Sequence, residues 1–488
     1  MQKHSILFTF QAQQFVIESG SLPFEAAAQG HEVYVALYWN DSVAQAYEDK
    51  CRAQGLQVRN YSTQLGFGTE AGRLAIIPAD RPGIHKFLSS RIRAVLSRFL
   101  PRSSPLRRFI SLPNYLHASI AAREIARKTW AWSRPDIYFS ASFGSIIGVE
   151  NHLAKIARQA GAKLFCYPTY PCYGEDVYIR RRFQNVDMGM WTNYLRADVD
   201  IVNRQLAKIF PHWIRSYNGK QQFAKDPIEM LAAWFQGLLY HDPWKKPYDI
   251  YDRIYVPYQF SAELLYRNGY AHNRVGMLGK PSIDQVARQC ADPGFVSRMQ
   301  EELGFTFDES FILFNVAPSA EHKNTSEDVH FRQFFAICDV LKATGQKIIL
   351  SLHPLCDFDT YNSHAMRYGF TISRNYQIYY LQPFCRFIVS HSCTTNHQGA
   401  LAGKKVIDID YLNLRFENLN MIAPEEIHPN IMLVPPEELA QAVDRLLAET
   451  ANNEHDAGSY YSAYAPAGAG IVKDAVVMTA TTAQGNVS

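Results

Sequence analysis

The sequence lacks the features that would assign it to a membrane-spanning, disulfide-rich or metal-binding class. No stretch approaches the roughly 18 to 20 apolar residues that a spanning helix needs, and no secretory h-region opens the chain. The eight cysteines are scattered and contain no CxxC pair, so we expect reduced thiols rather than disulfides or a metal site. We therefore expect a cytoplasmic protein whose membrane contact, if it has one, is peripheral.

The sequence also has little net charge. Lys and Arg together exceed Asp and Glu by only three, so the total charge says little about polyanionic partners. Residues 81–123 differ, because they contain no Asp or Glu and nine Lys or Arg. Apolar residues recur at helical spacing within 81–108, which suits either a basic surface helix or a helix held against an anionic membrane. No nucleic-acid recognition motif accompanies the block, so we expect no nucleic-acid partner.

Two series of short apolar runs, alternating with helix-like segments, fill most of the chain. A length of 488 residues corresponds to about two domains, and the alternation predicts parallel sheets built from βαβ units. The first series of runs covers 5–10, 32–38, 136–142, 162–170 and 252–258. The second covers 310–317, 346–354, 386–392, 404–410 and 430–435. We predict an α/β fold with two Rossmann-like domains.

The predicted domains span residues 1–290 and 309–450, with a polar, helical bridge between them. A Trp- and Tyr-rich insert at about 185–248 interrupts the first domain and fits no element type. Residues 451–488 are rich in Ala, Gly, Ser, Thr and Asn with little periodicity, so we expect a mostly disordered tail.

Hydroxyl groups gather where one strand of the second series ends. In parallel sheets, ligands bind beyond the carboxyl ends of strands, where backbone N–H groups favour anions. The stretch "SHSCTT" places Ser390, Ser392, Thr394 and Thr395 at such an end, just before a helix. Helix capping explains one hydroxyl. Four of them would also suit a phosphate or diphosphate.

His353 and Pro354 end the preceding strand of the same series. Proline stops the ladder and turns the chain, so His353 should point into the space that the hydroxyl groups face. A strand-end histidine can also be simply packed or solvated. Lys323, in "PSAEHKNTS", is either a phosphate ligand or a solvated loop lysine.

The first domain holds the candidate acids and bases. Glu175 and Asp176 follow a strand end in "YPTYPCYGEDVY", where a carboxylate suits general-base activation of a hydroxyl group, or simply forms a solvated acidic loop. Glu18, in "VIESGSLP" after the first strand, is the second candidate, or else a charge in the first turn of a helix. The run "SASFGS" at 140–145 is a further group of strand-end hydroxyls, or a set of helix caps.

Several of these landmarks together resemble a known enzyme class. "LHP" and "SHSCTTNHQGALAGKKVI" are similar in spacing to the C-terminal domain of GT-B glycosyltransferases, and "ILFNVAPS" resembles the opening of that domain. Before them, "DRIYVPYQFSAELLYRNGYAHNRVGMLGKPSID" is similar to the segment that closes the N-terminal domain in these proteins. The similarity is to capsule and lipopolysaccharide enzymes that use CMP-activated sugars such as sialic acid and Kdo, and it covers roughly 250–420. UDP-GlcNAc 2-epimerases and, more distantly, CDP-polyol phosphotransferases share parts of the pattern.

The resemblance implies a division of roles between the two domains. It implies that His353 contacts the nucleotide and that Ser392, Thr394 and Thr395 surround the donor phosphate, while the N-terminal domain binds the acceptor and supplies the catalytic carboxylate. Many relatives carry an acidic ribose ligand where this chain has Gln398, so a carboxylate is not available here for ribose recognition, although Gln398 could hydrogen-bond a hydroxyl of the donor. The resemblance implies no metal and no cofactor beyond the nucleotide-sugar substrate.

The sequence therefore predicts a GT-B glycosyltransferase, with two Rossmann-like domains facing across a cleft. Its donor would be a nucleotide sugar, best a CMP-activated ulosonic acid, and its acceptor a surface polysaccharide or lipid-linked glycan. Three alternatives stay open at this point: a UDP-GlcNAc 2-epimerase-like isomerase, a CDP-polyol phosphotransferase, and a non-catalytic assembly protein with the same fold.

Overall fold

The structure is a computed structural model that carries side chains. It describes residues 2–62, 112–140, 146–167, 195–217, 219–239, 243–244, 248–257, 259–267, 269–307, 310–321, 325–353, 355–376, 378–390, 395–401, 403–409, 411, 429–449 and 467–485. The chain divides into two compact units: unit 1 is Met1–Ser282 together with Pro466–Ser488, and unit 2 is Ile283–Ala465.

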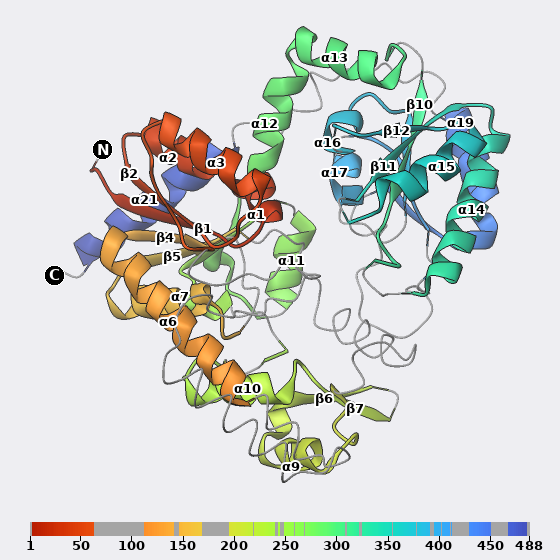
Figure 1. The fold of residues 1–488 in the computed structure, drawn as a ribbon. Helices are drawn as coiled ribbons and strands as arrows, with labels where there is room; N and C mark the ends of the chain where they lie inside the picture. The colour runs from red at the N-terminus through yellow and green to blue at the C-terminus, as the bar shows by residue number, and fades with distance from the viewer. Residues whose placement is uncertain are drawn as a thin grey trace. The chain divides into compact units, whose positions relative to one another are not determined.

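Unit 1 is built on a seven-stranded parallel sheet with the order β3-β2-β1-β4-β5-β8-β9 (Figure 1). Its strands are β1 (Ser5–Phe10), β2 (Glu32–Leu37), β3 (Gln57–Asn60), β4 (Ile137–Ser140), β5 (Lys163–Cys166), β8 (Arg253–Val256) and β9 (Val275–Met277). Its helices are α1 (Gln13–Ser19), α2 (Leu22–Ala28), α3 (Ser42–Ala53), α6 (Leu112–Ser133), α7 (Val149–Gln159), α9 (Ile201–Ile209), α10 (Pro227–Phe235), α11 (Gln259–Arg267) and α21 (Ala467–Gly485).

Unit 2 is built on a six-stranded parallel sheet with the order β12-β11-β10-β13-β14-β15. Its strands are β10 (Phe311–Val316), β11 (Lys347–Leu352), β12 (Thr371–Ser373), β13 (Phe387–Ser390), β14 (Val406–Ile409) and β15 (Ile431–Val434). Its helices are α13 (Pro293–Leu303), α14 (Glu327–Ala343), α15 (Phe358–Tyr368), α16 (Ile378–Leu381), α17 (Thr395–Leu401) and α19 (Leu439–Glu449); α12 (Pro281–Cys290) crosses the boundary between the units.

The central strands are apolar on both faces because helices cover both sides of each sheet. All six residues of β10 are buried, and β1 is buried from its second residue on. On one face of the unit 1 sheet, Phe8, Phe139, Phe165 and Tyr255 stack across β1, β4, β5 and β8, with neighbouring ring centroids 5.0 to 6.0 Å apart. Such continuous apolar runs are typical of buried parallel strands, and they explain why these strands were readable from the sequence.

The prediction of a mostly disordered tail is wrong for residues 467–485, which form α21 and pack against α2 and the aromatic face of the unit 1 sheet (Figure 1, dark blue). Asp474 accepts a 2.8 Å hydrogen bond from the Tyr255 hydroxyl and lies 3.4 Å from Arg253. Its glycines, threonines and valines lower the helix propensity of α21, and its apolar pattern is weak, so its stability comes from tertiary packing. The buried side chains of α21 include Ile471, Val472, Ala475 and Val476.

The insert that fitted no element type contributes to the core of unit 1 where it is described. It contains α9, the antiparallel hairpin of β6 (Ile214–Tyr217) and β7 (Lys220–Phe223), and α10, which packs on α6. The buried side chains of Trp213, Phe223 and Met230 join the same hydrophobic cluster as Ala122 of α6. The described part of the insert is therefore a folded extension of unit 1.

Candidate functional site

In an open parallel sheet, the strand order reverses at one point, and the crevice beyond the carboxyl ends of the two strands there is where ligands bind. In unit 2 this reversal lies between β10 and β13. Asn315 of β10 is paired in register with Ser390, the last residue of β13, and Thr395 begins α17. The Asn315 side-chain amide donates to Thr395 Oγ1 at 2.8 Å and to Ser390 Oγ at 3.3 Å. The structure therefore brings together two of the four predicted hydroxyls around an asparagine that sequence reasoning missed.

Two further side chains of α17 are buried with polar atoms that have no hydrogen-bond partner among the described residues. They are Asn396, through both its Oδ1 and Nδ2, and Gln398, through its Oε1. Both residues are at least 97% buried. Because an unpaired buried amide group costs about 1 to 3 kcal/mol, such atoms are the ones a polar ligand would satisfy. Gln398 was predicted as a donor ligand, and its burial beside this cluster fits that prediction without testing it.

His353 lies at the same edge of the unit 2 sheet. It directly follows β11, whose last residue, Leu352, pairs with Val316 of β10. The ring Nδ1 accepts a 3.2 Å hydrogen bond from the backbone N–H of Leu355, and the carbonyl of His353 accepts one from Cys356 at 2.9 Å. An accepting Nδ1 places the proton of the neutral ring on Nε2. His353 is therefore held as the start of a turn, one strand away from Asn315.

The remaining predicted donor and catalytic residues lie outside the described residues. They are Glu175, Asp176, Lys323, Pro354, Ser392 and Thr394, together with the basic segment 81–108.

Glu18 lies within the described residues. Its surroundings differ from those expected of a catalytic carboxylate and from those of a charge in the first turn of a helix. It lies in the last turn of α1 rather than in a first turn. Its Oε2 is 2.7 Å from the Lys280 ammonium and accepts a 3.2 Å hydrogen bond from the Ser282 hydroxyl. Both charged side chains are about nine-tenths buried. The Glu18 carboxylate therefore pairs with Lys280 and links the end of α1 to the start of α12.

The unit 1 sheet reverses its strand order between β1 and β4, and a different chemistry occupies that point. Thr9 of β1 is in register with Ser140, the last residue of β4, and Glu150 extends toward them from the first turn of α7. Thr9 Oγ1 donates to Glu150 Oε1 at 2.9 Å and lies 3.2 Å from the Tyr138 hydroxyl. Glu150 Oε2 is buried and has no hydrogen-bond partner among the described residues.

The protonation of Glu150 follows from this environment. Burial raises the pKa of Glu150 to about 8, while hydrogen bonds from the Thr9 and Ser140 hydroxyls act in the opposite direction. Burial also raises the pKa of Tyr138 well above its ordinary value. The carboxyl group is therefore mostly protonated at neutral pH. Sequence reasoning noted the hydroxyl run that begins at Ser140 but passed over Glu150; a carboxylate in the first turn of the helix after that run was the available signal.

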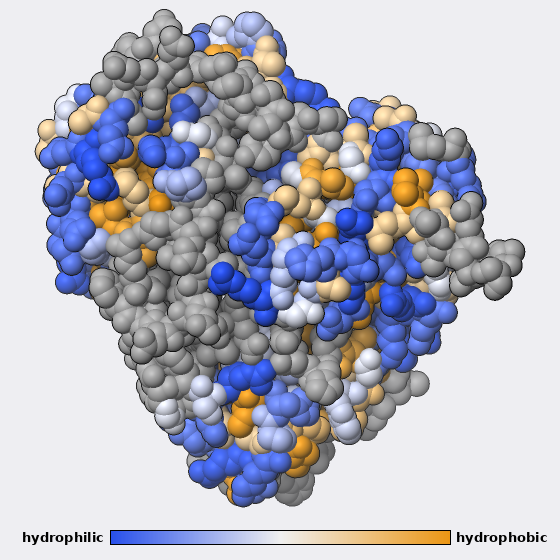
Figure 2. Space-filling view, turned by 180° about the vertical axis from the view of Figure 1, so that it is seen from behind, coloured by the Kyte–Doolittle hydropathy of each residue, from blue (hydrophilic) through white to orange (hydrophobic). Residues whose placement is uncertain are grey.

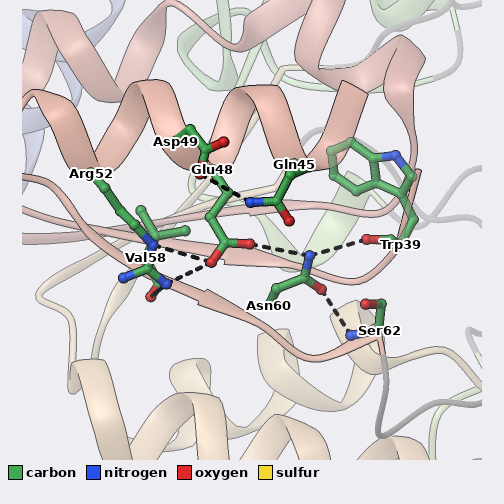
Figure 3. Close-up of polar contacts among 8 residues, drawn as sticks. All are labelled: Trp39, Gln45, Glu48, Asp49, Arg52, Val58, Asn60 and Ser62. Carbon is green, nitrogen blue, oxygen red and sulfur yellow. Dashed lines mark hydrogen bonds and ion pairs between the residues drawn. The ribbon is translucent and has the colours of Figure 1, made fainter. Parts of the chain in front are cut away.

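A shallow cavity of about 620 Å³ lies elsewhere in unit 1, between the edge strand β3 and helices α3 and α6. Several of its polar groups bond one another, as Figure 3 shows: Glu48 accepts from Arg52 and from Asn60, and the Asn60 side chain also bonds the backbone of Trp39 and Ser62. The Arg59 guanidinium lies over the Trp132 ring, 4.8 Å from its centre. These contacts, two strands away from the reversal point, indicate a structural network rather than a ligand site.

No group of three or more His, Cys, Asp or Glu side chains that could hold a metal ion occurs within the described ranges. No helix in that part of the chain is both long and apolar enough to cross a membrane.

Comparison with known proteins gives the fold. No family model and no curated protein matches this chain. Among solved structures, UDP-GlcNAc 2-epimerase from Methanocaldococcus jannaschii in complex with UDP-GlcNAc and UDP is 12% identical, with 97% of this chain and 99% of that chain covered and a TM-score of 0.50. UDP-GlcNAc 2-epimerase from Neisseria meningitidis bound to UDP-GlcNAc is 11% identical, with coverages of 98% and 99% and a TM-score of 0.49. The calicheamicin glycosyltransferase CalG4 is 13% identical, with 98% of each chain covered and a TM-score of 0.48.

These structural neighbours are enzymes with GT-B-like folds. At 12% identity the likeness with the Methanocaldococcus jannaschii structure shows the fold alone. It confirms the predicted α/β fold with two Rossmann-like parallel sheets, of seven and six strands, in a chain similar to GT-B-like proteins.

Proposed function

We propose that this protein is a glycosyltransferase that takes its sugar from a nucleotide donor, best a CMP-activated ulosonic acid such as Kdo, sialic or pseudaminic acid. The acceptor would be a surface polysaccharide or a lipid-linked precursor. The observation that carries the proposal is the cluster of Asn315, Ser390 and Thr395 at the reversal point of the unit 2 sheet. This is the place where parallel α/β sheets bind nucleotides.

The chemistry of that cluster suits a phosphate. Hydroxyl and amide groups donate hydrogen bonds to phosphate oxygens, and hydrogen bonds to an ionised partner are roughly twice as strong as neutral ones. The unpaired amide atoms of Asn396 and Gln398 add donors and acceptors for the base or the ribose. His353 supports the same site from the neighbouring strand. The amide and hydroxyl groups of this cluster are uncharged at neutral pH, so they would stabilise leaving-group charge through hydrogen bonds.

The transfer itself needs a base that accepts the proton of the acceptor hydroxyl as its oxygen bonds the anomeric carbon and the bond from that carbon to the donor phosphate breaks. Glu175 and Asp176 remain our proposed candidates for this base. Glu18 is the weaker candidate, because its carboxylate already pairs with Lys280. The cytoplasmic location and a membrane contact through 81–108 also remain part of the proposal.

Ligand-induced thermal shifts of the full chain with CMP, CDP, UDP and GDP test the donor assignment. We expect CMP to raise Tm most, and Thr395→Val to remove most of that shift because it deletes the hydroxyl without changing the shape of the side chain. The matched control is Thr371→Val in β12, a half-buried threonine away from the reversal point. A shift with UDP or GDP but not with CMP or CDP would refute the CMP donor.

The epimerase alternative has its own readout. Isomerisation of UDP-GlcNAc by the full chain with no acceptor present would replace the glycosyltransferase proposal. If no nucleotide shifts Tm and Thr395→Val behaves like its control, the chain does not use nucleotide sugars at this site, and a non-catalytic assembly protein becomes the better description.

A further inference from the structure

Exposed apolar side chains are concentrated in the insert of unit 1. Ten large apolar residues are exposed within the described ranges, and five of them lie between residues 199 and 235. These five are Val199, Ile201, Ile209, Trp234 and Phe235. Single exposed apolar residues need no explanation, but a contiguous group marks an interaction surface.

Four residues form one contiguous part of this surface, which we call the insert patch: Ile209, Phe210, Trp234 and Phe235. Ile209, Trp234 and Phe235 are 64%, 50% and 57% exposed. The Phe210 and Trp234 ring centroids lie 5.5 Å apart, and those of Trp234 and Phe235 lie 5.2 Å apart. The end of α9 and the end of α10 therefore present their aromatic side chains together.

The insert patch stands on a rigid base. The Phe210 ring stacks on the ring of Trp213, with centroids 3.9 Å apart and an interplanar angle of 6°. Trp213 is fully buried, and its carbonyl accepts a 3.0 Å hydrogen bond from the Trp244 indole. The aromatic groups are thus held in place before any partner arrives, which reduces the conformational entropy lost on binding.

The charge on the α9 side of the insert patch has one sign, while α10 carries Asp226 as its N-cap and Glu229 in its first turn, at the end opposite Trp234 and Phe235. Residues 201–225 contain no Asp or Glu and five Lys or Arg. Arg204 and Lys208 of α9 are exposed. At the other end of α9, Asp198 pairs with Arg196 at 2.6 Å and Asp200 caps the helix. The neighbouring carboxylates are therefore already engaged, and the exposed face of α9 is cationic beside its apolar end.

We propose that the insert patch docks on the surface of an anionic phospholipid bilayer. Trp234 and Phe235 would enter the headgroup layer, where aromatic side chains are enriched, while Arg204 and Lys208 would meet lipid phosphates. Figure 2 shows apolar and hydrophilic residues side by side at the end of unit 1 that carries α9 and the β6–β7 hairpin. A second copy of the chain fits less well, because self-association would bring two acid-free cationic segments together.

Co-sedimentation of the full chain with vesicles tests this surface. One set would be phosphatidylcholine alone, and the other would contain about one third phosphatidylglycerol, an anionic lipid. We expect binding to the anionic vesicles, weaker binding at high salt because screening shortens the reach of the charges, and little binding to phosphatidylcholine. Trp234→Ser combined with Phe235→Ser should weaken binding at least tenfold, and so should Arg204→Glu combined with Lys208→Glu.

The matched control replaces two exposed apolar residues of unit 2, Leu355→Ser with Met366→Ser, which are 55% and 71% exposed. It should bind like the unaltered chain. All substituted side chains are exposed, and circular dichroism would confirm that each variant folds. Three outcomes would overturn the proposal: no binding to anionic vesicles, binding that survives both insert-patch variants, or a dimer in solution that the Trp234 and Phe235 substitutions dissociate.

Discussion

The two sheets carry different chemistry at the points where their strand order reverses. In unit 1 the reversal holds the buried carboxyl group of Glu150, bonded by Thr9, with its pKa raised by burial to about 8. In unit 2 it holds an asparagine and two hydroxyls, none of which ionises at neutral pH. A protonated carboxyl group has a single proton to donate and would repel a phosphate on ionising, whereas amide and hydroxyl groups donate to a phosphate and stay neutral. The difference favours unit 2 as the half that binds the proposed anionic donor.

The units also differ in continuity. Unit 2 is one continuous segment, while unit 1 is completed by α21 from the far end of the sequence. Removal of residues 467–488 should therefore produce the largest effect on stability. It exposes the partners of Ile471, Val472 and Val476 and the Tyr255 hydroxyl, so we expect a loss on the order of 5 kcal/mol in the unfolding free energy of unit 1. Urea unfolding followed by hydrogen exchange should show unit 2 little changed. Equal protection of unit 1 in the shortened and full chains would contradict this dependence.

Because the folded protein holds a proton on Glu150, we expect its free energy of unfolding to depend on pH. Glu150→Gln should abolish this dependence. The folded protein keeps the Glu150 proton up to about pH 8, whereas the unfolded chain releases it near the ordinary pKa of 4.5. Because the folded state then binds more protons, its stability falls as pH rises through this interval, by up to about 1.4 kcal/mol per pH unit. Glu150→Gln has no such proton to lose.

The variant should therefore match the unaltered protein near pH 5 and exceed it in stability near pH 9, by a few kcal/mol. Urea unfolding at both pH values measures this. Glu301→Gln, at an exposed position of α13, is the control and should leave the pH profile unchanged. A Glu150→Gln variant that is no more stable than the unaltered protein at pH 9 would show that the carboxyl group is solvated or paired.

Asn315→Ala tests whether the nucleotide binds at the reversal point of the unit 2 sheet rather than at that of unit 1. It removes the group that bonds Thr395 and Ser390, so we expect nucleotide affinity to fall about tenfold, equivalent to about 1.4 kcal/mol. Titration calorimetry with CMP measures the change, at a temperature where both proteins are folded. Asn273→Ala, at an exposed position of unit 1, is the control. An unchanged affinity in Asn315→Ala would place the nucleotide elsewhere.

An effect of similar size is expected for the ion pair of Glu18 and Lys280. A double-mutant cycle with Glu18→Gln and Lys280→Met should give a coupling energy between about 1 and 2 kcal/mol in unfolding free energy, because the side chains are in contact and mostly buried. The Glu124 and Arg127 pair on the surface of α6 is the control and should couple by less than about 0.5 kcal/mol. A coupling near zero for Glu18 would leave its carboxylate available for catalysis.

The strands show what was readable from the pattern alone. The central strands were predicted close to their bounds, with 5–10 matching β1 and 310–317 containing β10. In the two parallel sheets, prediction missed β3, β9 and β12, which all lie at sheet edges. An edge strand is short and partly exposed, so sequences such as "QVRN" carry no apolar run.

The sequence by itself determined the α/β alternation and the strand end at Ser390, because buried parallel strands must be apolar and helices that follow them begin with hydroxyl groups. Only the tertiary structure decided which polar residues meet. Asn315 and Thr395 are 80 positions apart, Glu150 lies 141 positions from Thr9, and Glu18 and Lys280 are farther apart still. Burial and pairing at such distances depend on strand order, which local periodicity does not contain. The same reason explains α21, whose weak pattern becomes a helix only against the sheet that it covers.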